Sequence, residues 1–137
     1  MASGNGHYIF NAISNTASMV LVELYYNGSS YQVRGAVRTD AGGWQYTPYS
    51  TLTDARHYIE VDWRASSAAG MNNGSLTLWL DGVQVGLRSG VDNDTLRVDS
   101  VQLGATMSVD VGTRGTYFFD GFESRRLSYI GPEPATP

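Results

Sequence analysis

The sequence predicts an all-β protein, an antiparallel β-sandwich or jelly roll of eight or nine short strands. Three observations predict this class. Apolar and polar residues alternate with the period of a strand in segment after segment, turn-forming dipeptides separate these segments, and no helical period continues beyond one turn. The 16 glycines and the 12% aromatic content agree with a chain made of strands and turns.

The first predicted hairpin is centred on Asn27-Gly28. Segment 18–27 (SMVLVELYYN) and segment 30–39 (SYQVRGAVRT) both alternate, so each has one apolar face and one mixed face. An Asn-Gly pair between two alternating runs is typical of a hairpin turn. We therefore expect these two strands to be neighbours in one sheet.

The second predicted hairpin is centred on Asp81-Gly82, within segment 75–87 (SLTLWLDGVQVGL). The preceding segment 57–66 (HYIEVDWRAS) also alternates and places Trp63 on its apolar face. Segment 97–105 (RVDSVQLGA) and the aromatic segment 116–131 (TYFFDGFESRRLSYIG) are predicted to close the sheets.

Length and composition limit the remaining alternatives. The 137 residues fit one domain, which we place at residues 1–131, followed by a Pro-rich tail at 132–137. The net charge of −4 argues against a nucleic-acid partner, and all nine basic residues are arginines. There is no cysteine, no apolar run of membrane-spanning length, and no pattern of a signal peptide at the start.

The order of the segments resembles the laminin-G-like, concanavalin A-like jelly-roll domains over about residues 20–131. The resemblance rests on "HYIEVDW", "GSLTLWLDGVQV", "VDSVQLGA" and "GTYFFDGFESRR", in this order. It implies an antiparallel jelly roll and an extracellular or cell-surface setting. The family includes glycan-binding modules, adhesion and matrix domains, and β-glucanases, so the fold alone leaves the function open.

The glucanase branch of that family carries three carboxylates with the spacing E-x-D-x-x-E on one strand. This chain supplies Glu60 and Asp62, but the third position is Ala65, and Arg64 stands beside Asp62. A retaining glycosidase needs two carboxyl groups about 5–5.5 Å apart, whereas alternate residues of a strand are about 7 Å apart. We therefore expect no catalytic residues, and a glycan-cleaving enzyme is the weakest of the alternatives.

Asp120 lies within the most aromatic stretch of the chain, and three roles are open for it. It could bond to the backbone or to Arg125 or Arg126, it could contact a sugar, or it could bind calcium as last-strand aspartates of the resembled family do. Calcium needs six to eight oxygen ligands, and residues 1–22 contain no Asp or Glu to contribute. The acidic segment 90–95 (GVDNDT) is another candidate calcium loop.

Trp44, Tyr46 and Tyr49 are the candidate ligand-binding residues. They lie in "GGWQYTPYS", an aromatic stretch with the composition of a loop and no core period. Exposed aromatic rings with polar groups nearby are the usual means of holding a sugar, although a loop tryptophan can equally cover the core. The predicted function is therefore a non-catalytic extracellular binding or adhesion module whose favoured ligand is a glycan.

Asn27, Asn73 and Asn93 each begin an N-glycosylation sequon. All three are predicted to lie in turns, where a glycan can be attached. Asparagine is also simply a good turn residue, so the sequons by themselves do not indicate modification.

The N-terminal part of the chain raises the alternative of self-assembly. Members of the resembled family carry further strands before the matched region, so we expect an incomplete sheet edge here. The alternating segment 7–13 (HYIFNAI) could complete the sheet of another copy and build a fibre, or could pair with its own sheet.

Overall fold

The computed structural model describes residues 5–132, which form nine strands and no helix. That part of the chain therefore supplies no apolar helix that could cross a membrane. The strands are β1 (Asn5–Ser14), β2 (Ala17–Tyr26), β3 (Tyr31–Arg38), β4 (Trp44–Tyr46), β5 (Ser50–Leu52), β6 (Ile59–Arg64), β7 (Gly74–Leu80), β8 (Val83–Val91) and β9 (Ser100–Met107).

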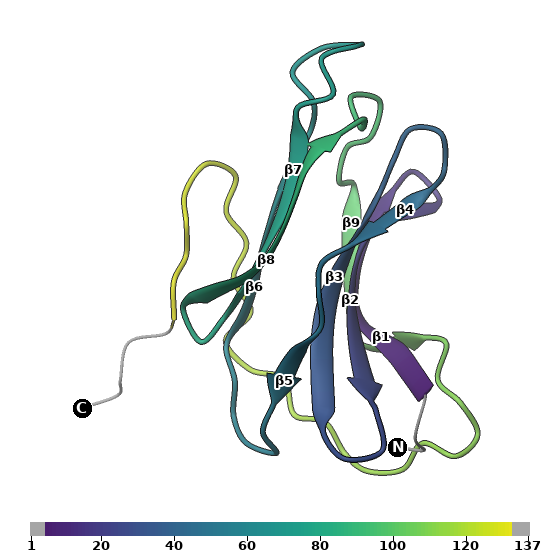
Figure 1. The fold of residues 1–137 in the computed structure, drawn as a ribbon, viewed down its shortest axis with the longest axis vertical. Helices are drawn as coiled ribbons and strands as arrows, with labels where there is room; N and C mark the ends of the chain where they lie inside the picture. Colours follow the sequence, from purple (N-terminus) through teal and green to yellow (C-terminus); the bar gives the residue numbers. More distant parts are fainter. Residues whose placement is uncertain (1–4, 133–137) are drawn as a thin grey trace.

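The strands form two antiparallel sheets that face each other in a β-sandwich-like arrangement (Figure 1). The large sheet has six strands in the order β4-β3-β2-β1-β9, with β5 also paired to β3. The small sheet has three strands in the order β6-β7-β8. The prediction of an all-β fold is thus confirmed.

Both predicted hairpins are present. β2 and β3 pair with Tyr26 opposite Tyr31, and the Asn27 side chain accepts hydrogen bonds from the backbone of the turn. In the β7–β8 turn, Asp81 has φ 53° and Gly82 has φ 80°. Positive φ at both turn residues is the geometry that Asp-Gly favours in a two-residue hairpin.

The core lies between the two sheets. Val20 and Val37 of the large sheet pack with Leu76 and Val91 from β7 and β8, and all four are at most 1% exposed. Trp63 packs against this cluster, as its place on the apolar face of the sequence segment predicts. Each fully buried aliphatic side chain of this kind contributes about 1.5–3 kcal/mol relative to an exposed one.

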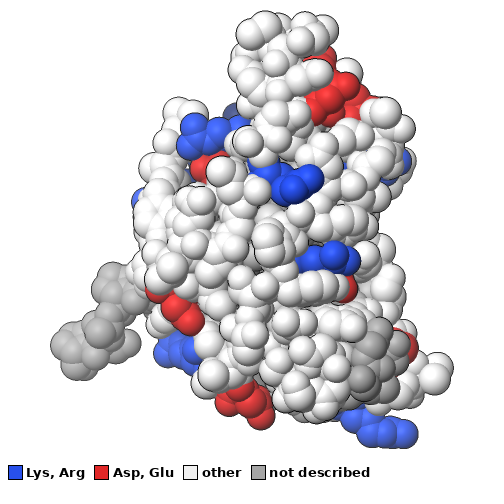
Figure 2. Space-filling view, viewed as in Figure 1, with Lys and Arg blue, Asp and Glu red and all other residues white. Residues whose placement is uncertain are grey.

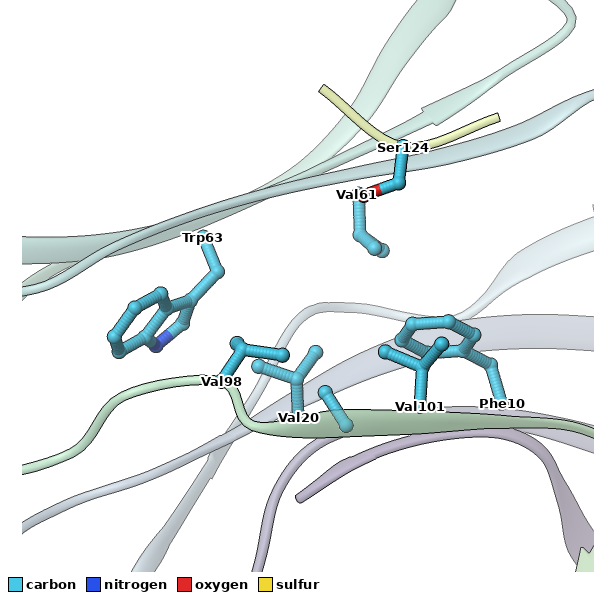
Figure 3. A pocket seen from close by; sticks show the side chains of 8 residues that line it. Phe10, Val20, Val61, Trp63, Val98, Val101 and Ser124 are labelled. Carbon is cyan, nitrogen blue, oxygen red and sulfur yellow. The ribbon is translucent and has the colours of Figure 1, made fainter. Parts of the chain in front are cut away.

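A gap of about 130 Å³ remains between the sheets beside this core. Figure 3 shows Val61 and Trp63 of β6 on one side of the gap and Phe10 and Val101 of the large sheet on the other. The indole nitrogen of Trp63 is buried and has no hydrogen-bond partner among the described residues. The packing of the sandwich is therefore looser here than around Val37 and Leu76, which do not line the gap.

β1 pairs on both of its sides within its own chain, with β2 on one side and β9 on the other. Of the two arrangements expected from the sequence, the segment 7–13 thus adopts pairing with its own sheet. A bulge between Tyr8 and Phe10 interrupts the alternation, so that Ile9 is buried and Phe10 also packs against the core.

The prediction that segment 116–131 forms a closing strand is wrong. Residues 108–132 contain no strand, and this segment crosses below both sheets and then runs beside the small sheet (Figure 1). The place next to β1 is already taken by β9, so that edge of the large sheet is not available to this segment. Side chains hold the segment instead, since Glu60 accepts hydrogen bonds from the N–H groups of Ile130 and Gly131 at 2.8 and 3.0 Å.

Candidate functional site: the outer face of the large sheet

The outer face of the large sheet carries a cluster of tyrosines around one ion pair. Alternation along β2 and β3 turns Val20, Val22 and Leu24 toward the small sheet and turns Glu23 and Arg34 outward. Glu23 and Arg34 are directly opposite each other in the ladder. Opposite charges in this position stabilise a pair of strands.

Glu23 is almost completely buried, with 8% exposure, so its carboxylate needs partners. Arg34 Nε donates to Glu23 Oε2 at 2.7 Å, and the Tyr49 hydroxyl donates to Glu23 Oε1 at 2.8 Å. Gly6 provides the space, because a Cβ atom at this position would come within 2.5 Å of Glu23 Oε1. A charged residue on a sheet face is thereby fixed in one orientation.

Aromatic rings surround the Arg34 guanidinium. Its Cζ atom lies 4.0 Å from the ring centre of Tyr46 and 4.4 Å from that of Tyr49. Tyr49 in turn stacks on Tyr25, with 5.0 Å between the ring centres. Cation–π contacts of this kind contribute about 0.5–1 kcal/mol at exposed sites and more when desolvated. We call Glu23, Tyr25, Arg34, Tyr46 and Tyr49 the tyrosine cluster.

Thr47 anchors the chain between the two tyrosines that sequence reasoning selected. It is 3% exposed, and its hydroxyl accepts a hydrogen bond from the Gly35 N–H at 2.9 Å. The positions of Gly35 and Gly86 leave room for it, since a Cβ at Gly86 would come within 2.6 Å of Thr47. With Thr47 buried at the sheet edge, Tyr46 and Tyr49 are both held beside Arg34.

The sequence suggested that Trp44 and Tyr46 lie in a loop, and this is wrong. Both belong to β4, which pairs with β3 so that Tyr46 is opposite Ala36 and Trp44 is opposite Arg38. Three residues are too few to show a period, which is why the strand is missed. Trp44 is partly exposed and does not belong to the described core clusters, and the Arg38 guanidinium lies 6.0 Å from its ring centre.

The buried carboxylate also affects the neighbouring phenols. Burial raises the pKa of Tyr49, and the hydrogen bond to Glu23 raises it further. Burial and the same carboxylate raise the pKa of Tyr8, which lies opposite Glu23 on β1. Both phenols therefore stay protonated over the whole physiological range and offer hydroxyl groups to a ligand or to Glu23.

Among the described residues, Asp120 belongs to no group of three or more possible metal ligands. Asp120 is exposed, and its carboxylate accepts a hydrogen bond from the adjacent Gly121 N–H at 2.8 Å. The three carboxylates that do meet in the described part of the chain are those of Asp40, Asp92 and Asp94, with oxygens within 4.8 Å of one another. Two of them come from the segment 90–95 that the sequence indicated as another calcium loop.

Electrostatics within this acidic group differ from one carboxylate to the next. Burial raises the pKa of Asp40, but hydrogen bonds from Thr95 outweigh burial and hold the pKa below its usual value. For Asp94, slight desolvation and then the contact with Asp40 raise the pKa. Three oxygen donors from two loops are fewer than the six to eight that Ca²⁺ takes, so water would have to supply the rest.

The carboxylates considered for catalysis are engaged with other groups. Glu60 binds the backbone of residues 130 and 131, and Asp62 accepts hydrogen bonds from Arg64 at 3.0 and 3.2 Å. Both lie on the outer face of the small sheet, where the neighbouring Trp79 packs on Tyr129. Both carboxylates also line a wide hollow whose lining includes Asp120 and Arg125 of the C-terminal segment.

The three sequon asparagines differ sharply in accessibility. Asn27 and Asn73 are exposed and accept hydrogen bonds from nearby backbone N–H groups. Asn93 is fully buried, its Nδ2 donates to the Arg64 carbonyl at 3.1 Å, and its Oδ1 accepts from the Ser66 N–H at 2.7 Å. A glycan on Asn93 is incompatible with this packing.

Sequence reasoning selected Tyr46, Tyr49 and Trp44 but missed Glu23, Tyr25 and Arg34. A signal for these residues was present, because the Asn27-Gly28 hairpin sets a register that puts Glu23 opposite Arg34. Tyr49 could not be connected to them in this way, since its position depends on the pairing of β5 with β3.

Comparisons with known proteins add no identification. No family model, no curated protein and no solved structure matches this chain.

Proposed function

We propose that the protein is a non-catalytic extracellular or cell-surface binding module, a jelly roll of the laminin-G-like, concanavalin A-like kind, which holds a glycan on the outer face of its large sheet. The observation that carries the proposal is the tyrosine cluster, in which partly exposed rings are fixed around Arg34 on an open sheet face. Rigid aromatic side chains bind a ligand at a low cost in conformational entropy.

The chemistry of the cluster suits a sugar. Ring faces can pack on the apolar C–H face of a pyranose, while phenol hydroxyls and guanidinium N–H groups bond its hydroxyls. The distribution of charge agrees with a ligand of this kind. Figure 2 shows charged side chains scattered over the visible side and separated by broad uncharged surface. The engagement of Glu60 and Asp62 further favours binding over cleavage.

Tyr46→Ala tests this proposal, because Tyr46 is 37% exposed and its loss should leave the fold intact. We expect retention of the protein on an immobilised glycan panel to fall with Tyr46→Ala and with Trp44→Ala, at unchanged melting temperature. Phe118→Ala is the matched control, since Phe118 is 92% exposed and lies outside the cluster. Equal retention of all variants, or no retention of the wild type on any glycan, would refute the proposal.

A second candidate function is self-assembly into an extracellular fibre, and the exposed apolar residues of the C-terminal segment favour it. Phe118, Phe122 and Leu127 are 92%, 57% and 98% exposed, and β6 forms an edge of the small sheet. Sedimentation of the wild type against a Phe118→Ser, Phe122→Ser double variant tests it. A monomer at all concentrations would exclude assembly through this segment.

A further inference from the structure

The outer face of the large sheet carries positive charge on an acidic protein. In the strands of this sheet, the side chains charged at neutral pH are Glu23, Arg34 and Arg38. Two arginines thus accompany one glutamate, whereas the whole chain has a net charge of −4. Glu23 is neutralised by Arg34, so the charge of Arg38 remains.

Part of the Arg34 side chain reaches the surface. Its Nε is used by Glu23, while in the described part of the chain no hydrogen bond involves its two terminal nitrogens. Tyr46 and Tyr49 hold the guanidinium plane, and the side chain is 25% exposed. A fixed guanidinium with two free N–H groups side by side matches the two oxygens of a carboxylate.

Arg38 is a second arginine of β3 whose guanidinium lies beside an aromatic ring, that of Trp44. It lies four residues from Arg34 on the same face, which is about 13 Å along a strand. Its Nη1 makes a long contact of 3.4 Å with the Ser18 carbonyl, and Trp44 lies opposite it. Tyr46 is opposite Ala36, midway between the two arginines. The face thus presents cation, ring and cation in a row that is longer than one sugar.

We propose that the glycan bound here is acidic, an oligosaccharide of uronic acids whose carboxylates pair with Arg34 and Arg38 and whose rings lie on Tyr46 and Trp44. This inference rests on the proposed function and specifies its ligand class. The charge that remains on Arg38 and the planar fork of Arg34 favour carboxylates, and the aromatic row between the arginines favours a sugar chain.

Calorimetric titration with oligosaccharides of polygalacturonic acid tests the inference, with their fully methyl-esterified form as the uncharged match. We expect binding of the acid form, loss of binding on esterification, and weakening as salt screens the charges. Arg38→Gln should weaken binding about tenfold, since one charge-assisted pair is lost. Arg88→Gln is the matched control, because Arg88 is an exposed arginine on β8 of the small sheet.

The outcomes separate the ligand class from the function. Equal binding of acid and ester, lost in Trp44→Ala, would overturn the acidic ligand and leave glycan binding in place. If dextran sulfate binds as tightly as the acid form, the site does not select carboxylates, because negative charge alone would then account for the affinity. If the protein binds neither the acid form, nor the ester, nor dextran sulfate, the inference is overturned. If it also fails to bind neutral glycans, the proposed function is overturned. Arg34→Lys, which keeps the charge and loses the fork, should also weaken binding.

Discussion

Replacement of Asn93 by alanine should destabilise the fold strongly. The side chain is fully buried and links two segments, through the Ser66 N–H at 2.7 Å and the Arg64 carbonyl at 3.1 Å. Alanine leaves both groups without this partner, and a buried unsatisfied group costs about 1–3 kcal/mol. We expect the free energy of unfolding to fall by about 2–4 kcal/mol.

Thermal and urea unfolding measure this loss. For a chain of this length, about 3 kcal/mol corresponds to a melting temperature lowered by roughly 10 °C. Asn73→Ala is the matched control, because Asn73 bonds the Ser67 N–H in a similar way but is exposed. We expect that variant to lose less than about 1 kcal/mol, since water can replace the bond. If the two variants melt together, the argument from burial is refuted.

Two further predictions concern charge. His7 is 1% exposed and contacts Tyr117, and its burial lowers the pKa of its imidazole. Neutral His7 therefore contributes stability that is complete above the unfolded pKa. This stability is lost as the pH falls below about 6.5. The melting temperature should therefore fall between pH 7 and pH 5 more steeply than in His7→Gln, and parallel curves would exclude His7 as the cause. In chelator, Asp94→Asn should raise the melting temperature because it removes one of three crowded carboxylates. If Asp40, Asp92 and Asp94 bind calcium, added calcium should raise the melting temperature of the wild type more than that of Asp94→Asn. It should raise the melting temperature of Asp120→Asn as much as that of the wild type. If calcium changes the melting temperature of none of the three proteins, calcium binding is excluded.

Local patterns predict the hairpins of this protein, and distant pairings decide its candidate site. Asn27-Gly28 and Asp81-Gly82 mark their turns because Gly28, Asp81 and Gly82 have positive φ, which few residues accept. The meeting of Asp40 with Asp94 depends instead on how two loops pack, which no pattern within either loop encodes. For the same reason Tyr49 is recognisable as aromatic from the sequence but not as the partner of Glu23.

The segment 116–131 shows how a local pattern can mislead. Its aromatic residues have the composition of a strand, yet the position beside β1 is already filled by β9 and the Glu60 side chain binds the backbone of the last residues. Strand composition indicates only that a segment could join a ladder. Whether an edge is available depends on the order of all the other strands.

The pairing of β1 with β9 has a consequence for how the protein is made. The two strands meet across the chain, with Asn11 and Gln102 separated by 91 positions. A ribosome adds about 5–20 residues per second, so β1 waits roughly 5–20 s after synthesis before its second neighbour exists. During that time β1, β2 and β3 can form a meander from local contacts, but the backbone groups on the far side of β1 remain open to any extended segment nearby. Neighbouring nascent chains on one messenger RNA carry the same open strand, so close spacing of ribosomes exposes this fold to pairing between copies.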